Sequence, residues 1–226
     1  LPMLRIASPL LVVFSMAAAL AAKSVPAPPN ILFIMSDDHA VNAISAYGGR
    51  LAEVAPTPNI DRLGREGMRF DKTFVTNSIC TPSRAVILSG QHAHLNTMRT
   101  LGDAFPAPEA VVANVADSLS RYGSRTAPFG KWHIRSQPWG FDYWKVGPGQ
   151  GLYHDPVFVD SDDEVIYDQT LTHKIARTTG YYTELVTDNA IDWIDNLTDQ
   201  KPTFMMLHRK AQPGTTTSAE CRPKYL

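Results

Sequence analysis

Two apolar runs stand out along the chain because neither alternates with polar residues. Residues 30–36 read Asn-Ile-Leu-Phe-Ile-Met-Ser, and residues 204–207 read Phe-Met-Met-Leu. A short apolar run without alternation is typical of a strand buried on both faces of a parallel sheet. The pattern therefore predicts two such buried strands, and a further strand is predicted over residues 68–75.

Helix signals lie between these runs. A Thr-Pro pair precedes each of two predicted helices, over residues 57–67 and 82–88, because Thr caps a helix and Pro suits its first turn. In the second helix Thr81 is the expected N-cap, which places Cys80 just in front of the helix N-terminus. Apolar residues at helical spacing predict two further helices, over residues 108–122 and 181–197.

The order of the predicted elements indicates the fold class. Strands that alternate with helices are typical of an α/β fold with a mainly parallel central sheet, whose ligands gather at the carboxyl ends of the strands. Residues 130–151 are dense in Gly, Pro and aromatic residues and are expected to form a long ordered loop. Such loops often carry function.

The first residues have the pattern of an export signal. Arg5 precedes an apolar run over residues 10–22, which is too short to span a bilayer and contains Ala-Leu-Ala at 19–21. We expect residues 1–22 to be a signal peptide and 23–29 a Pro-rich linker, so that the mature protein is secreted or periplasmic and has no membrane span. A buried helix or a membrane anchor is the alternative interpretation of the run.

Composition and charge narrow the possible partners. The 226 residues have a formal net charge of -1 and no basic stripe, so neither nucleic acid nor an anionic membrane surface is an expected partner. Two cysteines in an exported chain would ordinarily form a disulfide, here between Cys80 and Cys221.

Cys80 can also be interpreted as part of an anion-binding site, because residues 80–84 read Cys-Thr-Pro-Ser-Arg at the start of a predicted helix. A helix N-terminus favours negative charge through its free N–H groups and its dipole. Arg84, one turn into the helix, can hold an oxyanion with its planar guanidinium. The pattern indicates an anion site beside Cys80, and the alternative is a disulfide-bonded or buried Cys ahead of an ordinary helix.

Asp37 and Asp38 directly follow the first predicted strand. Two neighbouring carboxylates at the end of a buried strand repel each other at high cost unless a cation is bound. Oxygen ligands suit Ca²⁺ or Mg²⁺ rather than Zn²⁺. The pair therefore predicts a divalent-cation site, whereas two Asp residues on a solvated turn would be the alternative.

These motifs resemble those of the type I sulfatases, which depend on formylglycine. Residues 30–39 and 80–84 are similar to that family, as is the Gly-Lys-Trp-His of residues 130–133. The resemblance implies that a formylglycine-generating enzyme oxidises Cys80 to formylglycine, and that Asp37, Asp38 and residue 80 bind Ca²⁺, with Mg²⁺ the less favoured ion. It further implies that Arg84 helps to hold the diol of residue 80, that Lys131 binds a sulfate oxygen, and that His133 contacts a formylglycine hydroxyl and assists the release of sulfate.

The same resemblance implies an alkaline-phosphatase-like sandwich in which residues 30–226 form an incomplete N-terminal catalytic domain. Within the family, the chain looks most like the branch that contains N-acetylglucosamine-6-sulfatases and related heparan or mucin sulfatases. This resemblance implies a sulfated carbohydrate substrate. After the second apolar strand, relatives read Lys-Ala-Pro-His, whose His protonates the leaving alcohol. This chain reads Lys-Ala-Gln-Pro at residues 210–213, so that His is absent, and residues 212–221 look like a frameshift.

Two alternatives remain for the function. One is a phosphodiesterase or phosphonate hydrolase of the same superfamily, and the other is a non-catalytic, truncated product that binds glycans.

Five further polar residues are expected to be structural or ordinary surface residues: His92, His94, Asp61, Arg62 and Asp71.

Overall fold

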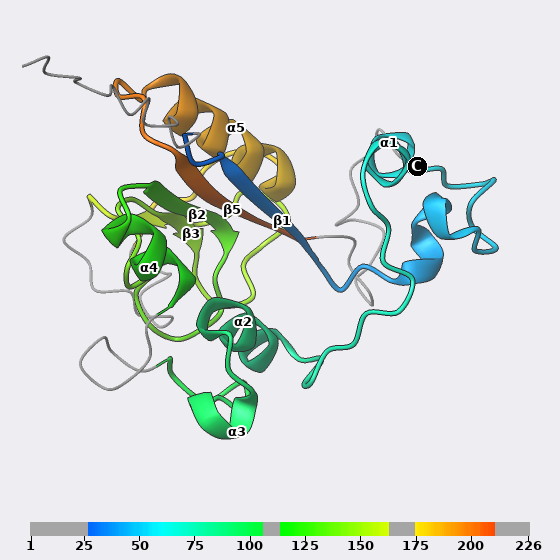
Figure 1. Cartoon of the computed structure of the whole chain (residues 1–226), viewed down its shortest axis with the longest axis horizontal. Helices are drawn as coiled ribbons and strands as arrows, with labels where there is room; N and C mark the ends of the chain where they lie inside the picture. Colours follow the sequence, from blue (N-terminus) through cyan, green and yellow to red (C-terminus); the bar gives the residue numbers. More distant parts are fainter. Residues whose placement is uncertain (1–26, 106–113, 163–174, 211–226) are drawn as a thin grey trace, which may run out of the picture.

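The computed structural model describes residues 27–105, 114–162 and 175–210, which are arranged around one five-stranded sheet (Figure 1). The strand order is β1-β5-β2-β3-β4, in which β4 pairs antiparallel with β3 and all other neighbours are parallel. The predicted α/β class with a mainly parallel sheet is confirmed. The strands are β1 Ile31–Asp37, β2 Arg125–Lys131, β3 Lys145–Gly147, β4 Val159–Asp160 and β5 Thr203–Lys210.

Helices cover both faces of the sheet. Helix α5 packs against β5 and β2, and helix α4 packs against β2 and contacts α2. Helix α1 contacts η2 and lies away from the sheet in Figure 1. The helices are η1 Val41–Ala43, η2 Ser45–Tyr47, α1 Pro58–Glu66, α2 Cys80–Ser89, α3 Ala93–Asn96, α4 Val115–Arg121 and α5 Tyr182–Asp195.

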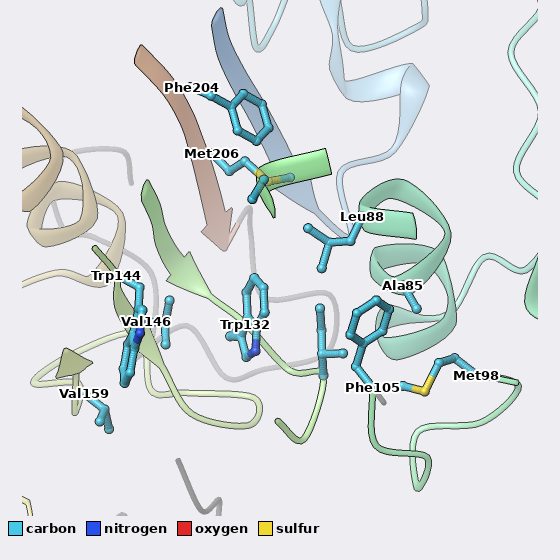
Figure 2. Packing of buried hydrophobic residues seen from close by; sticks show 12 residues of the cluster. Ala85, Leu88, Met98, Phe105, Trp132, Trp144, Val146, Val159, Phe204 and Met206 are labelled. Atoms are coloured by element: carbon cyan, nitrogen blue, oxygen red, sulfur yellow. The ribbon is translucent and has the colours of Figure 1, made fainter. Parts of the chain in front are cut away.

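Strand β5 divides the core in two because successive side chains point to opposite faces of the sheet. Phe204 and Met206 join the cluster that includes residues of α2 and α4, shown in Figure 2. Met205 and Leu207 join the cluster under α5. The strand predicted over residues 204–207 is confirmed, and its continuous apolar sequence reflects burial on both faces.

Strand β1 forms where the sequence predicts it, but the expectation of burial on both faces is wrong. Ile31, Leu32 and Ile34 are all exposed. Among the described residues, β1 pairs only with β5 and lies at the edge of the sheet. A strand at an edge has a neighbour on one side only, so its apolar sequence does not ensure its burial.

The segment 68–75 is not a strand, because no neighbouring strand of the described chain pairs with it; Phe70 and Phe74 are exposed. Helix α2 begins at Cys80 rather than at Pro82, with Ile79 as its N-cap. The expected capping role of Thr81 is therefore wrong.

The structure also contains the three other predicted helices, in whole or in part. The helices predicted over residues 57–67 and 181–197 are confirmed as α1 and α5. The helix predicted over 108–122 is observed from Val115, and residues 106–113 lie outside the described residues.

Two inner strands have no counterpart among the predicted elements. Strand β2 carries Pro128, a residue that argues against an inner strand because it has no N–H to donate. The pairing with β3 begins at Phe129, one residue later. Strand β3 lies within the segment expected to be a loop.

The signal peptide predicted for residues 1–22, most of the predicted linker and the segment 212–221 lie outside the described residues. Within the described part of the chain, no helix is both long enough and apolar enough to cross a membrane.

Candidate active site

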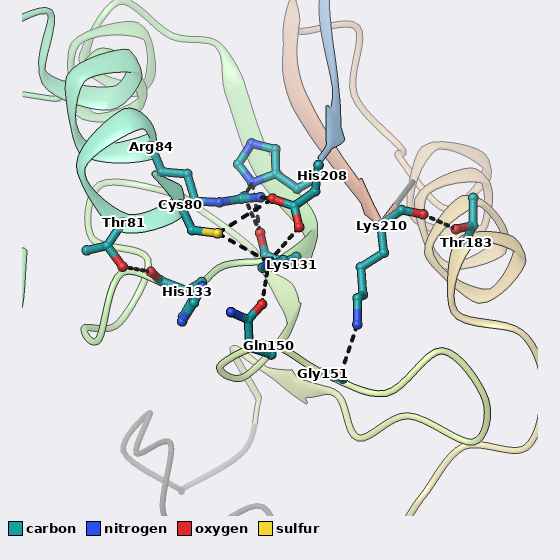
Figure 3. A network of polar contacts seen from close by, with 11 residues as sticks. Cys80, Thr81, Arg84, Lys131, His133, Gln150, Gly151, Thr183, His208 and Lys210 are labelled. Atoms are coloured by element: carbon teal, nitrogen blue, oxygen red, sulfur yellow. Dashed lines mark hydrogen bonds and ion pairs between the residues drawn. The ribbon is translucent and has the colours of Figure 1, made fainter. Parts of the chain in front are cut away.

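The carboxyl ends of three neighbouring strands bring charged side chains together (Figure 3). Asp37 ends β1, Lys131 ends β2, and His208 lies near the end of β5, which separates the other two. Helix α2 adds Cys80 and Arg84 from its first turns. Residues far apart in the sequence therefore meet at the edge where parallel sheets bind ligands.

Asp37 lies at the centre of this cluster. Arg84 Nη2 donates to its Oδ1 at 3.1 Å, and Lys131 Nζ donates to its Oδ2 at 2.5 Å. Burial by itself would raise the pKa of Asp37, but the hydrogen bonds and positive charges of Lys131 and Arg84 outweigh it and lower the pKa below the ordinary 3.8. Asp37 is therefore an ionised carboxylate shared by two cations.

Lys131 is buried and makes three contacts with its ammonium group. Besides Asp37, Nζ donates to Gln150 Oε1 at 2.6 Å and lies 3.5 Å from the sulfur of Cys80. Gln150 follows β3 in the segment that connects to β4. The sequence motifs gave no reason to expect Gln150 at the site.

Cys80 occupies the first position of α2, where backbone N–H groups lack helical partners. It is a free cysteine of intermediate burial, and its Sγ lies 3.9 Å from Asp37 Oδ1. Cys221, the alternative disulfide partner, is outside the described residues. The next residue, Thr81, is buried and donates through Oγ1 to the carbonyl of His133 at 2.7 Å. This bond ties the start of α2 to the segment after β2.

His133 has a positive φ of 52°, and its side chain is buried beside the cluster. Burial, with the positive charges of Lys131 and Arg84, lowers its pKa to about 4. The imidazole is therefore neutral near neutral pH. Its Nδ1 is buried and has no hydrogen-bond partner among the described residues.

His208 belongs to the cluster although no sequence motif indicated it. Its Nδ1 lies 3.0 Å from Arg84 Nη1 and 3.1 Å from the carbonyl of Lys131, and its ring stacks on Trp132. Complete burial, aided by the charge of Arg84, lowers its pKa to about 3. A neutral His208 can accept from the guanidinium and hold it toward Asp37. The sequence did contain one indication of this position: His208 directly follows the strand predicted over residues 204–207, and ligands gather at the carboxyl ends of such strands.

The cavity beside the cluster has a volume of about 510 Å³, and Asp37, Asp38, Cys80 and Arg84 are among its lining residues. Asp38 is exposed and adopts a left-handed backbone with φ 54°. Carboxylate oxygens on one cavity fit a hard divalent cation. The described residues nevertheless contain no group of three His, Cys, Asp or Glu side chains arranged to hold a metal ion. They fit only part of such a site.

The other polar residues singled out in the sequence lie elsewhere. The exposed rings of His92 and His94 stack on each other at 5.9 Å. Asp61 accepts hydrogen bonds from Ser45 and Thr57, so it links α1 to η2 rather than being a plain surface charge. Arg62 is exposed, and Asp71 pairs with Arg69 at the surface.

Comparisons with known proteins agree with this arrangement. The sulfatase family profile matches residues 29–217. The N-acetylglucosamine-6-O-sulfatase of Bacteroides thetaiotaomicron is 38% identical over 186 residues, which are 81% of this chain and 30% of the relative. Human N-acetylgalactosamine-6-sulfatase is 29% identical over 209 residues, 81% of this chain and 39% of the relative.

Among solved structures, that of BT4656 in complex with its substrate D-glucosamine-2-N,6-O-disulfate superposes with a TM-score of 0.72 at 38% identity. The match covers 82% of this chain and 35% of that one. The chain thus spans about a third of the length of the relatives it matches.

Proposed function

Because the chain belongs to the sulfatase family, we propose that it supplies the nucleophile and the anion-binding residues of an enzyme that hydrolyses sulfate esters of a sugar. The observation that carries the proposal is the junction of α2 with the ends of β1 and β2, where Cys80, Arg84 and Lys131 surround Asp37. A nucleophile position beside two cations suits an anionic ester.

Residue 80 would act as formylglycine, whose hydrated form has two hydroxyls on one carbon. One hydroxyl would attack sulfur and form the sulfate ester of residue 80, and the alcohol would leave with the proton that this hydroxyl gives up. The other hydroxyl would then lose its proton, expel sulfate and restore the aldehyde. Arg84, fixed by Asp37 and His208, would hold the attacking group and the sulfate at the start of α2. Lys131 would neutralise a sulfate oxygen. The neutral His133 would accept the proton of the second hydroxyl.

A divalent cation would be held by Asp37, Asp38 and residue 80, and Ca²⁺ is the ion that best suits these ligands. When bound, it would supply positive charge beside the nucleophile and the sulfate. Ca²⁺ takes about six to eight oxygen ligands, so further ligands must come from outside the described residues. The chain by itself should therefore hydrolyse sulfate esters slowly.

A 6-sulfated amino sugar within a glycan is the substrate class we favour, since a 38% identical relative is an N-acetylglucosamine-6-O-sulfatase. Residues 30–226 would be part of the catalytic domain. Residues 1–22 would direct it to the secreted or periplasmic space after a linker at 23–29. There it would meet sulfated carbohydrates.

The first test is the maturation of Cys80. The chain is coexpressed with a formylglycine-generating enzyme, and the peptide that contains residue 80 is examined by mass spectrometry. We expect conversion of Cys80 in the wild type and a much lower yield in Arg84→Lys, which alters the motif. Quantitative pairing of Cys80 with Cys221 would contradict the proposal.

The second test concerns the reaction type. The converted chain is assayed on an aryl sulfate, a 6-sulfated N-acetylglucosamine and an aryl phosphodiester, with Cys80→Ala as the control. Slow sulfate release that Cys80→Ala abolishes supports the proposal. Hydrolysis of the phosphodiester alone would favour the phosphodiesterase alternative, and binding of sulfated glycans without hydrolysis would favour the non-catalytic one.

A further inference from the structure

Gln150 is a neutral side chain beside a cluster of charged ones, and its orientation is fixed by Lys131. Its Oε1 accepts from Lys131 Nζ at 2.6 Å. An ammonium group only donates hydrogen bonds, so the oxygen of the amide must face it and the NH₂ group must face elsewhere. Gln150 is exposed, and Figure 3 shows its nitrogen pointing away from Lys131. The residue therefore presents a hydrogen-bond donor at the open side of the cluster.

The backbone beside Gln150 is held from the inside of the molecule by Lys210, the last residue of β5. Lys210 Nζ donates to the carbonyl of Gly151 at 3.0 Å and lies 3.8 Å from the centre of the Tyr153 ring. The side chain of Lys210 is buried, and its carbonyl accepts from Thr183 Oγ1 near the start of α5. Hydrogen bonds from a charged donor are stronger than neutral ones. The exposed side chain of Gln150 thus starts from a fixed backbone.

Tyr182 holds the same segment from a second direction. Its side chain is fully buried, and its N–H donates to the carbonyl of Tyr153 at 2.8 Å. Gly147 lies so close to Tyr182 that a side chain there would collide with the hydroxyl. Residues on both sides of Gln150 are therefore tied to α5 and β5, so its amide is in place before any ligand arrives. Such preorganisation lowers the cost of binding.

We propose that Gln150 is a substrate-binding residue, whose Nε2 donates to an oxygen of the sugar that carries the sulfate ester, and that Lys210 positions it. The proposal rests on the function proposed above. The charged sulfate matches the cations of Arg84 and Lys131, whereas a neutral amide matches a neutral acceptor such as a sugar hydroxyl or an acetamido carbonyl. Lys131 Nζ lies 3.5 Å from Cys80 Sγ and 2.6 Å from Gln150 Oε1. A sugar whose ester reaches residue 80 therefore has its neighbouring oxygens within reach of the amide.

The experiment compares the affinities of the full, unconverted chain for N-acetylglucosamine 6-sulfate and for inorganic sulfate, both measured by NMR titration. Gln150→Leu should lower the affinity for the sugar sulfate about fivefold relative to that for inorganic sulfate, the effect of one hydrogen bond. The ratio of the two affinities is the readout, because loss of the contact with Lys131 affects both ligands alike.

Gln91→Leu is the matched control for this titration, since Gln91 follows the end of α2 opposite to Cys80. Its affinity ratio should equal that of the wild type. An unchanged ratio in Gln150→Leu, or no binding of the sugar sulfate by the wild type, would overturn the proposal.

Lys210→Met tests the positioning role. It should lower the same ratio about threefold in the wild type and have no further effect in Gln150→Leu, because Lys210 acts through Gln150. Lys145→Met is the control, because Lys145 lies on β3 and pairs with Asp160. Equal effects of Lys210→Met with and without Gln150 would overturn this role. If circular dichroism shows that Lys210→Met does not fold, Lys210→Gln, which is polar but shorter, takes its place.

These titrations involve neither formylglycine nor turnover. Failure of Cys80 to mature would refute the proposed function and leave the measured affinity ratios intact. An unchanged ratio in Gln150→Leu would refute the role of Gln150 and leave the maturation of Cys80 intact.

Discussion

Strands β1 and β5 are parallel neighbours with similar apolar sequences and opposite surroundings. They pair residue for residue, with Ile34 opposite Leu207. Leu207 is 5% exposed because β5 lies between β1 and β2 and beneath α5, whereas Ile34 at the sheet edge is 50% exposed. The difference teaches that an apolar run predicts a strand, while the position of the strand in the sheet decides its burial.

The same contrast holds for the polar residues at the strand ends. His208 lies on β5 and Lys131 ends the neighbouring strand β2, and both side chains are buried and hydrogen-bonded. Just past the end of β1, Asp38 is exposed to the cavity. Packing therefore buries the polar residues at the ends of the inner strands, whereas Asp38, just past the edge strand, stays exposed.

Among single substitutions, the largest effect should come from the register partners themselves. Leu207→Ala should lower the free energy of unfolding by about 3 kcal/mol, because it leaves a cavity under α5. Ile34→Ala should cost less than about 1 kcal/mol, since the side chain is half exposed. Urea unfolding measures both. Equal losses would show that β1 is as well packed as β5.

Asp37→Asn compares the two carboxylates at the end of β1. It removes the negative charge shared by Lys131 and Arg84 and should cost about 2 kcal/mol, less than for a fully buried pair because a cavity reaches the site. Asp38→Asn, on an exposed residue, should change stability by less than about 0.5 kcal/mol. A loss with Asp38→Asn that matched Asp37→Asn would remove the distinction.

Acid should destabilise the chain through its buried histidines. In the unfolded chain a His takes up a proton near pH 6.5, whereas folded His208 and His133 have pKa values of about 3 and about 4. Stability should therefore be full near neutral pH and fall below about pH 6.5, by about 1.4 kcal/mol per pH unit for each His.

His208→Asn should roughly halve that slope between about pH 6 and pH 5, because one of the two buried imidazoles is gone. Urea unfolding at several pH values measures the slope. A slope in His208→Asn equal to that of the wild type would mean that His208 takes up its proton in the folded chain.

The smallest effect concerns the bond between α2 and the segment after β2. Thr81→Val removes the hydrogen bond to the carbonyl of His133 and should cost about 1 kcal/mol. Thr73→Val, on an exposed residue, should be nearly neutral. Thermal unfolding of the two variants tests whether the buried contact stabilises the site.

Much of the candidate site could be predicted because its motifs are local. Cys80 and Arg84 lie one turn apart on one helix, and Lys131 and His133 lie in one short segment. His208 and Gln150 could not be found in this way, since their contacts with Arg84 and Lys131 join residues far apart in the sequence. Strand β2 was missed for a related reason: its pairing with β5 outweighs the local preference of Pro128.

By itself, the sequence determined the fold class, most of the helices and several of the residues that gather at the candidate site, because these depend on local periodicity and short motifs. Only the tertiary structure decided that β1 lies at the edge and β5 inside, that Asp37 is shared by Arg84 and Lys131, and that His208 supports Arg84. The physical reason is that burial and charge pairing depend on which segments become neighbours, and strand order is a non-local property.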